Sequence, residues 1–249
     1  MIELQQVTKV FNPGKANKVL SLAGISLEIK KQQFVVVVGA NGSGKTTLLN
    51  IISGAEFATE GKILLDGKDI SRLPEHRRSR WIARVFQDPL KGTSAELSIL
   101  ENFRLAAIRT TSKKLLIGLN EVFKKRVQER ISVLGMGLEN KLELPMGSLS
   151  GGQRQALTLL MSVMDETQIL LLDEPCAALD PRSAALILQI AGNIIEQYKL
   201  TALLITHNLK EAHSYGNRII QLGEGKIMRD LKGEEKTALT LEGMYSWFN

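Results

Sequence analysis

Apolar residues in this chain are grouped in short runs that differ in their spacing. Phe34–Val38, Ile169–Leu172 and Thr201–Ile205 are almost continuously apolar. Such runs are typical of strands that are buried on both faces of a parallel sheet. Ile2–Phe11 and Ile25–Ile29 instead alternate between apolar and polar positions. This alternation predicts strands with one buried face.

Other segments have helical spacing. Thr46–Ile52 follows a glycine-rich turn and predicts a helix. A second helix is predicted by apolar residues three or four apart, with Gly135 as its C-terminal cap: Val122, Phe123, Val127, Ile131 and Leu134. A third is predicted by a similar stripe: Leu186, Ile187, Ile190, Ile194 and Ile195. Asn208, with Glu211 three residues later, predicts the start of one more helix.

The order of these elements predicts an α/β fold with a parallel sheet. Lys62–Leu65 is a further short strand, and Arg218–Gln221 with Lys226–Arg229 forms a predicted hairpin. Strand signals are almost absent from Pro89 to Ser148 and resume afterwards. We therefore expect one domain over residues 1–249, with a helical insertion over about 89–164.

The composition excludes several classes of protein but does not identify the class to which this chain belongs. The chain has 249 residues, of which 44% are hydrophobic and 23% charged, with a formal net charge of +6. These values exclude disordered and collagen-like classes. Cys176 is the only cysteine, which excludes an internal disulfide and a four-cysteine zinc site. No apolar run approaches the length of a membrane helix, and the first residues do not resemble a signal peptide.

Residues 39–46 read Gly-Ala-Asn-Gly-Ser-Gly-Lys-Thr and fit G-x-x-x-x-G-K-[ST] without a mismatch. Glycines allow backbone N–H groups to converge, and the following helix adds its positive end. Lys45 should reach the β- and γ-phosphates, and Thr46 should bind Mg²⁺. No Asn-Lys-x-Asp guanine reader occurs, which favours ATP. The predicted nucleotide-binding residues here are Gly39, Asn41, Gly42, Ser43, Gly44, Lys45, Thr46 and Thr47.

Two acids follow the apolar run that begins at Ile169. Successive side chains of a strand point to opposite sides, so Asp173 and Glu174 can serve different purposes. Asp173 suits Mg²⁺ binding through water, and Glu174 suits polarisation of an attacking water.

Residues 149–153 read Leu-Ser-Gly-Gly-Gln, and here the sequence resembles the ATP-binding cassette (ABC) family. The resemblance implies a P-loop fold with a RecA-like, mostly parallel sheet, an antiparallel β subdomain and a helical signature subdomain. It also implies that the signature faces the γ-phosphate held by another subunit. The residues concerned are Ser150, Gly151, Gly152 and Gln153.

The same resemblance assigns further roles. Gln87 matches the glutamine that senses Mg²⁺ and the attacking water, and His207 matches the histidine that contacts the γ-phosphate. Asp180 lies in the loop that touches the opposite subunit, where Ala177 replaces a common serine. Phe11 stands where the family often stacks an aromatic ring on adenine. Glu174, His207 and Gln87 are thus the catalytic candidates, and Thr46, Gln87 and Asp173 the metal ligands.

The resemblance also implies partners. A homodimer would sandwich two ATP molecules at the cytoplasmic face of the membrane, docked on separate permease subunits and served by an extracytoplasmic solute-binding protein. Nucleic acid is not expected. The stretch after Gln87 would contribute to the docking groove.

A finer resemblance is to tryptophan/tyrosine-type amino-acid importer cassettes, although Pro175 replaces their usual histidine. The matching stretches are 11–14, 73–77, 84–89, 149–160 and 233–236. Two alternatives stay open: an exporter or lipoprotein-release cassette, and a nucleic-acid-linked ABC ATPase.

Overall fold

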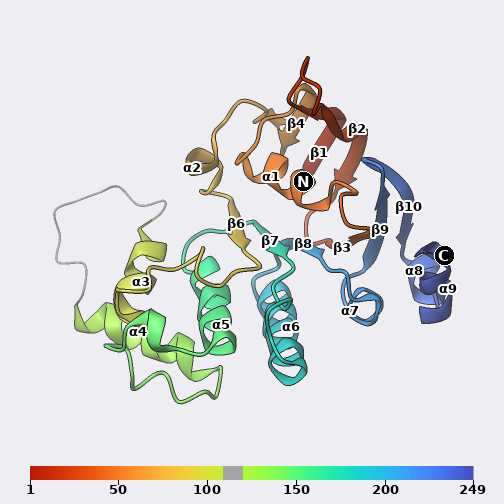
Figure 1. The fold of residues 1–249 in the computed structure, drawn as a ribbon. Coiled ribbons are helices and arrows are strands. Elements are labelled where there is room, and N and C mark those ends of the chain that lie inside the picture. The colour runs from red at the N-terminus through yellow and green to blue at the C-terminus, as the bar shows by residue number, and fades with distance from the viewer. Residues whose placement is uncertain (109–119, 249) are drawn as a thin grey trace. The chain divides into compact units, whose positions relative to one another are not determined.

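The computed structural model describes residues 1–108 and 120–248. The chain forms two compact units: Met1–Ile82 with Leu200–Asn249, and Ala83–Lys199 (Figure 1). The predicted insertion over 89–164 lies within the second unit. That unit also contains one of the predicted apolar strands and the helix after it, so it is larger than the insertion.

The first unit contains a four-stranded antiparallel sheet in the order β2-β1-β4-β5. Its strands are β1 (Ile2–Phe11), β2 (Val19–Ile29), β4 (Glu60–Leu65) and β5 (Lys68–Asp69). Ile2 pairs with Ile29 and Leu4 with Leu27, and all four side chains are buried. The alternation of apolar and polar positions thus correctly predicted a sheet with one face in the core.

The other strands of this unit provide the parallel part of the fold. β3 (Phe34–Gly39) pairs in parallel with β8 (Thr201–Ile205) and β9 (Arg218–Gly223), and β10 (Lys226–Lys232) is antiparallel to β9. Helix α1 (Lys45–Ser53) contacts both β2 and β3 and buries four large aliphatic side chains. The remaining helices are α2 (Glu75–Arg78), α7 (Leu209–Ser214), α8 (Glu234–Ala238), α9 (Leu241–Tyr245) and the 3₁₀ turn Ser246–Phe248.

The second unit is mainly helical. Its strands β6 (Ile82–Val85) and β7 (Ile169–Asp173) are neighbours in a sheet. Its helical elements are α3 (Ile99–Ala107), α4 (Glu121–Ser132), the 3₁₀ turn Met146–Ser148, α5 (Gly151–Ser162) and α6 (Pro181–Gln197). Helix α5 contacts α3, α4 and α6, so it is the centre of this packing. None of the helices in the described residues combines the length and apolar character that a bilayer crossing requires.

The helix predicted around Phe123 is confirmed as α4, but one residue of its apolar stripe is not buried. Phe123, Val127 and Ile131 are buried, whereas Val122 is 81% exposed. Residues four apart lie on one helix face, and Val122 is turned away from that face by about 100°. The helix ends at Ser132, and Leu134 lies beyond it. Gly135, the predicted cap, has φ +63°, and its N–H donates to Ser132 O at 3.1 Å. Leu186 is likewise 39% exposed at the edge of its stripe.

A buried arginine fixes the end of α1. The Arg78 side chain is 0% exposed, and its Nη1 donates to Ile51 O and Ile52 O at 2.6 and 2.9 Å. Its Nε and Nη2 donate to Leu73 O and Ser71 O. Burial lowers the pKa of Arg78 to about 10, and nearby Asp69 opposes this shift. A cation at the carbonyl end of a helix is favourable, so Arg78 stabilises the last turn of α1.

We expect Arg78→Met to lower the free energy of unfolding by about 3 kcal/mol, because four carbonyl oxygens lose a charged donor inside the protein. Urea denaturation followed by circular dichroism measures this change. Arg77→Met, at an exposed position of the same helix, is the matched control and should have little effect. Equal effects of the two substitutions would contradict the structural role of Arg78.

Candidate functional site

The turn between β3 and α1 is a glycine cradle in which side chains would not fit. A Cβ atom added to Gly39 would lie 2.3 Å from Leu222 O and 2.5 Å from Ser43 Oγ. Gly44 has φ +100°, and its Cβ would lie 2.5 Å from Ser21 O. Both positions therefore require glycine. The absence of side chains at these two positions allows the backbone to curve tightly here.

Polar groups of this turn suit a phosphate and a metal. Lys45 is 5% exposed, and its Nζ donates to Gly39 O and Ala40 O, each at 2.9 Å. Ser43 Oγ is buried and has no hydrogen-bond partner in the described part of the chain. Thr46, the predicted metal ligand, is exposed at the start of α1. A buried ammonium, an unsatisfied hydroxyl and a helix start together fit an anion with a metal beside it.

His207 lies beside this turn. A cavity of about 250 Å³ is lined by Gly39, Asn41, His207 and, unexpectedly, Phe248 near the C-terminus, with three further residues: Val38, Ala40 and Leu209. His207 is exposed and precedes Asn208, the N-cap residue of α7. The predicted cap of α7 is confirmed, because Asn208 Oδ1 accepts from the backbone N–H groups of residues 210 and 211.

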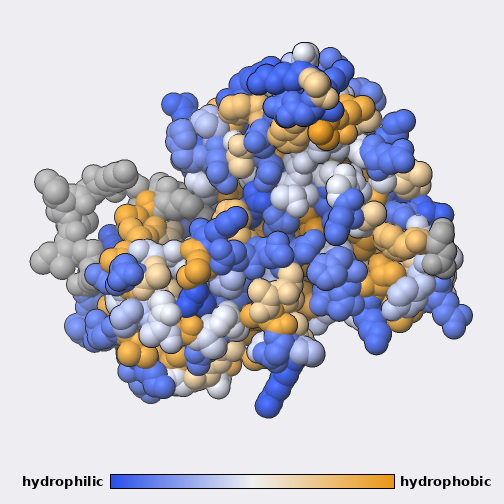
Figure 2. Space-filling model, viewed as in Figure 1, coloured by the Kyte–Doolittle hydropathy of each residue, from blue (hydrophilic) through white to orange (hydrophobic). Residues whose placement is uncertain are grey.

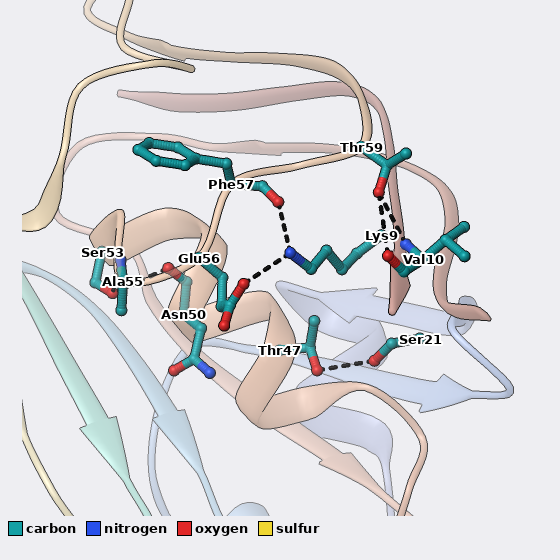
Figure 3. A network of polar contacts seen from close by, with 10 residues as sticks. All are labelled: Lys9, Val10, Ser21, Thr47, Asn50, Ser53, Ala55, Glu56, Phe57 and Thr59. Atoms are coloured by element: carbon teal, nitrogen blue, oxygen red, sulfur yellow. Dashed lines mark hydrogen bonds and ion pairs between the residues drawn. The ribbon is translucent and has the colours of Figure 1, made fainter. Parts of the chain in front are cut away.

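Phe11 lies at the end of β1 in a polar network. Lys9 Nζ stands 4.7 Å from the centre of the Phe11 ring and donates to Glu56 Oε2 and Phe57 O. Figure 3 shows this lysine between the two acceptors and, separately, Thr47 hydrogen-bonded to Ser21. The ammonium occupies one side of the Phe11 ring through a cation–π contact. An adenine would therefore need the other side of the ring.

In the second unit, the two acids have different surroundings. Asp173 ends β7, is 8% exposed, and accepts a hydrogen bond from Arg84 Nη2 at 2.5 Å. Glu174 is partly exposed and has φ +47°, so the chain leaves the strand at this residue. A positive φ at a residue with a long side chain is uncommon and recurs at functional sites. The two carboxylates therefore differ through the turn at Glu174 as well as through the strand alternation that the sequence predicted.

The signature segment forms the start of α5. Ser150 Oγ accepts from the Gln153 N–H at 3.3 Å, and Gln153 Oε1 accepts from the Ser150 N–H at 3.1 Å. This capping box leaves the exposed Ser150 and Gly151 at the positive end of a helix.

Asp180 occupies the corresponding position of α6, and a hydrogen bond from Ser183 lowers the pKa of its carboxyl group. The two helix starts are close, because a Cβ on Gly152 would lie 3.2 Å from Ser183 Oγ. The second unit thus brings the signature segment and the Asp180 loop together.

Gln155, whose role was not predicted from the sequence, links two of the predicted motifs of this unit. It is 0% exposed, and its Nε2 donates to Phe86 O and Pro175 O, both at 3.0 Å. Phe86 directly precedes the exposed Gln87, and Pro175 directly follows Glu174. One side chain of α5 therefore holds the segments that carry two of the catalytic candidates. The sequence showed only a glutamine two residues after the signature, and its burial is known from the structure alone.

Comparisons with known proteins agree with this geometry. The family model for the ABC transporter matches residues 22–177. A tyrosine transport ATP-binding protein of Clostridioides difficile strain R20291 is 37% identical, covering 100% of this chain and 98% of that protein. The phosphonates import ATP-binding protein PhnC of Lactococcus lactis subsp. lactis strain IL1403 is 30% identical, covering 98% of each.

The solved structures include a dimeric post-hydrolysis state of the ATP-binding cassette MJ0796 bound to ADP and Pi. It superimposes with a TM-score of 0.79 at 30% identity, covering 93% of this chain and 98% of that one. The fold and the phosphate loop define an ATP-binding cassette of the ATPase class. This chain belongs to the ABC transporter family.

We expect Gln155→Leu to destabilise the protein by about 2 kcal/mol, because two buried carbonyl oxygens lose their donor. Removal of the buried Gln155 Oε1, which has no hydrogen-bond partner in the described part of the chain, offsets a part of this loss. Denaturant unfolding measures this change. Gln189→Leu, at an exposed position of α6, is the control and should be nearly neutral. A neutral Gln155→Leu would show that the two hydrogen bonds contribute little.

Proposed function

We propose that this chain is the ATP-binding and hydrolysing subunit of a transporter and that it powers uptake of a small solute through separate permease subunits. The observation that carries this proposal is the glycine cradle with the buried Lys45 ammonium. Gly39 and Gly44 must be glycine because a Cβ there would collide with neighbouring backbone oxygen atoms. The turn that they permit places the buried Lys45 ammonium beside the start of α1, where an anion is favoured. A triphosphate is the ligand that this arrangement fits best.

Nucleotide binding is assigned to the first unit. Lys45 would exchange its two carbonyl acceptors for the β- and γ-phosphates, and the loop N–H groups would donate to phosphate oxygens. Phe11 would take the adenine on the side of its ring that Lys9 leaves open. The remaining proposed contacts are those of Asn41, Gly42, Ser43 and Thr47.

Hydrolysis is assigned to Glu174, Gln87 and His207. Glu174 would accept a proton from the attacking water, which is the role of a general base. Gln87 would orient that water, and His207 would donate to the γ-phosphate. A bound Mg²⁺ would neutralise developing charge on the phosphates, and Thr46, Asp173 and Gln87 are the residues that would hold it.

The signature residues are assigned to the nucleotide of a second copy of the chain. Ser150 and Gly151 are exposed at a helix start, where the positive end of α5 favours a phosphate. Gly152, Gln153 and Asp180 lie at the same pair of helix starts. ATP would then join two subunits with twofold symmetry, and hydrolysis would release them.

The surface of the second unit supports docking to a permease. A cavity of about 410 Å³ is lined by residues of the stretch after Gln87, including Lys91 and Thr93, and by Leu105 of α3. Leu90 and Leu105 are 49% and 52% exposed. Apolar side chains are visible at the surface over the helical part of this unit (Figure 2). An exposed apolar surface around a cavity suits a partner helix.

The solute is proposed to be an aromatic amino acid. The support is the tyrosine transport relative, which matches this chain over almost its full length. The cassette would act at the cytoplasmic face of the membrane, where an extracytoplasmic solute-binding protein influences it only through the permease.

Two inactive variants should complement each other if each site uses two subunits. Lys45→Ala removes the phosphate lysine, and Ser150→Glu places a negative charge at the signature. Each alone should hydrolyse almost no ATP. An equimolar mixture should recover about a quarter of wild-type turnover, because half of the dimers are mixed and each of these has one complete site. A mixture no more active than its components would contradict the shared site.

The import proposal is tested with the complete transporter in lipid vesicles. Tyrosine-loaded binding protein should raise ATP turnover several-fold over the unloaded protein, and phosphonate-loaded protein should not. Labelled tyrosine should move in the inward direction. Turnover without stimulation, or outward release of a cargo, would contradict import while leaving the ATPase assignment intact.

A further inference from the structure

Asp173, the proposed metal carboxylate, is paired with an arginine to which no role has been assigned. Arg84 Nη2 lies 2.5 Å from Asp173 Oδ2, and the two side chains are only 9% and 11% exposed. Arg84 projects from β6 and Asp173 ends the neighbouring strand β7. The ion pair therefore joins two adjacent strands and has little exposure to solvent.

The guanidinium group of Arg84 is fixed from a second direction. It lies 4.8 Å from the centre of the Phe86 ring, which is a cation–π contact. The backbone oxygen of Phe86 is in turn held by Gln155. Arg84 is thus immobilised between an aromatic ring and a carboxylate. An arginine held in this way can determine the orientation of its partner.

A carboxylate has two oxygen atoms, and the ion pair uses Oδ2. Oδ1 belongs to the same rigid group, so fixing Oδ2 also fixes the direction of Oδ1. Carboxylates that bind metals are commonly held by such outer hydrogen bonds, which set their orientation. We propose that Arg84 is the positioning residue of Asp173 and leaves Oδ1 available to bind the metal. This proposal rests on the magnesium-nucleotide binding proposed above.

The alternative is that Arg84 competes with the metal and must be displaced. Separating a nearly buried ion pair leaves a charge without its partner and costs several kcal/mol. Mg²⁺ keeps much of its water shell and is satisfied by a single carboxylate oxygen, often through water. Displacing Arg84 would therefore cost more free energy than a water-mediated metal contact could provide. Positioning predicts that loss of Arg84 weakens the effect of the metal, whereas competition predicts that it strengthens it.

The experiment measures how much the metal tightens nucleotide binding. Fluorescent ATP is titrated onto Glu174→Gln protein, which should not turn over, once with EDTA and once with Mn²⁺. The ratio of the two dissociation constants is the metal factor. Adding Arg84→Gln should reduce this factor about tenfold and leave binding in EDTA within about twofold, because an outer partner acts through the metal ligand. Arg126→Gln, at an exposed position of α4, should leave the factor unchanged.

A double-mutant cycle separates positioning from a general loss of structure. Asp173→Asn should reduce the metal factor on its own, and Arg84→Gln should then have no further effect. Arg84→Lys keeps the charge and should retain a larger factor than Arg84→Gln. If Arg84→Gln does not fold, as judged by circular dichroism, Arg84→Lys carries the same cycle. An unchanged or larger metal factor would overturn the inference. Failure of the Glu174→Gln protein to bind nucleotide would instead overturn the proposed function.

Discussion

The buried ammonium of Lys45 is the constraint around which the phosphate loop is arranged. A charge that is 5% exposed needs acceptors, and Gly39 O and Ala40 O supply them from the turn that precedes α1. The turn can bring these oxygen atoms inward only because Gly39 and Gly44 have no side chains. The same curvature leaves the start of α1 open to an anion. Lys45 is thus held near the position in which a phosphate would replace the carbonyl oxygens.

This arrangement depends on a correctly placed α1, which is fixed at its far end. Arg78 binds the carbonyl oxygens of Ile51 and Ile52 in the last turn of the helix. Ser21 of β2 binds Thr47 in the first turn. Between these ends, the helix buries aliphatic side chains against both sheets of its unit. Packing in the middle and polar contacts at both ends therefore act together to hold the helix in place.

The sequence predicted those parts of the structure that depend on local patterns. The apolar runs of β3, β7 and β8 and the phosphate loop need only neighbouring residues to be recognised. The helix cap at Asn208 is equally local. β6 was missed because Arg84 interrupts the apolar pattern of this four-residue strand. The partner of Arg84 is Asp173, which lies 89 positions away in the sequence. Arg78 and Gln155 were missed for the same reason, since a polar residue looks exposed until its distant acceptors are known. The boundaries of the second unit also depend on such contacts.

Arg84 and Gln155 act on the same short segments from different elements. Gln155 binds the backbone next to each of two catalytic candidates, while Arg84 binds the proposed metal carboxylate and packs on Phe86. Arg84 also lines the 410 Å³ cavity that the proposed permease would enter. One side chain is therefore shared by the wall of this cavity and by the ion pair at the end of β7.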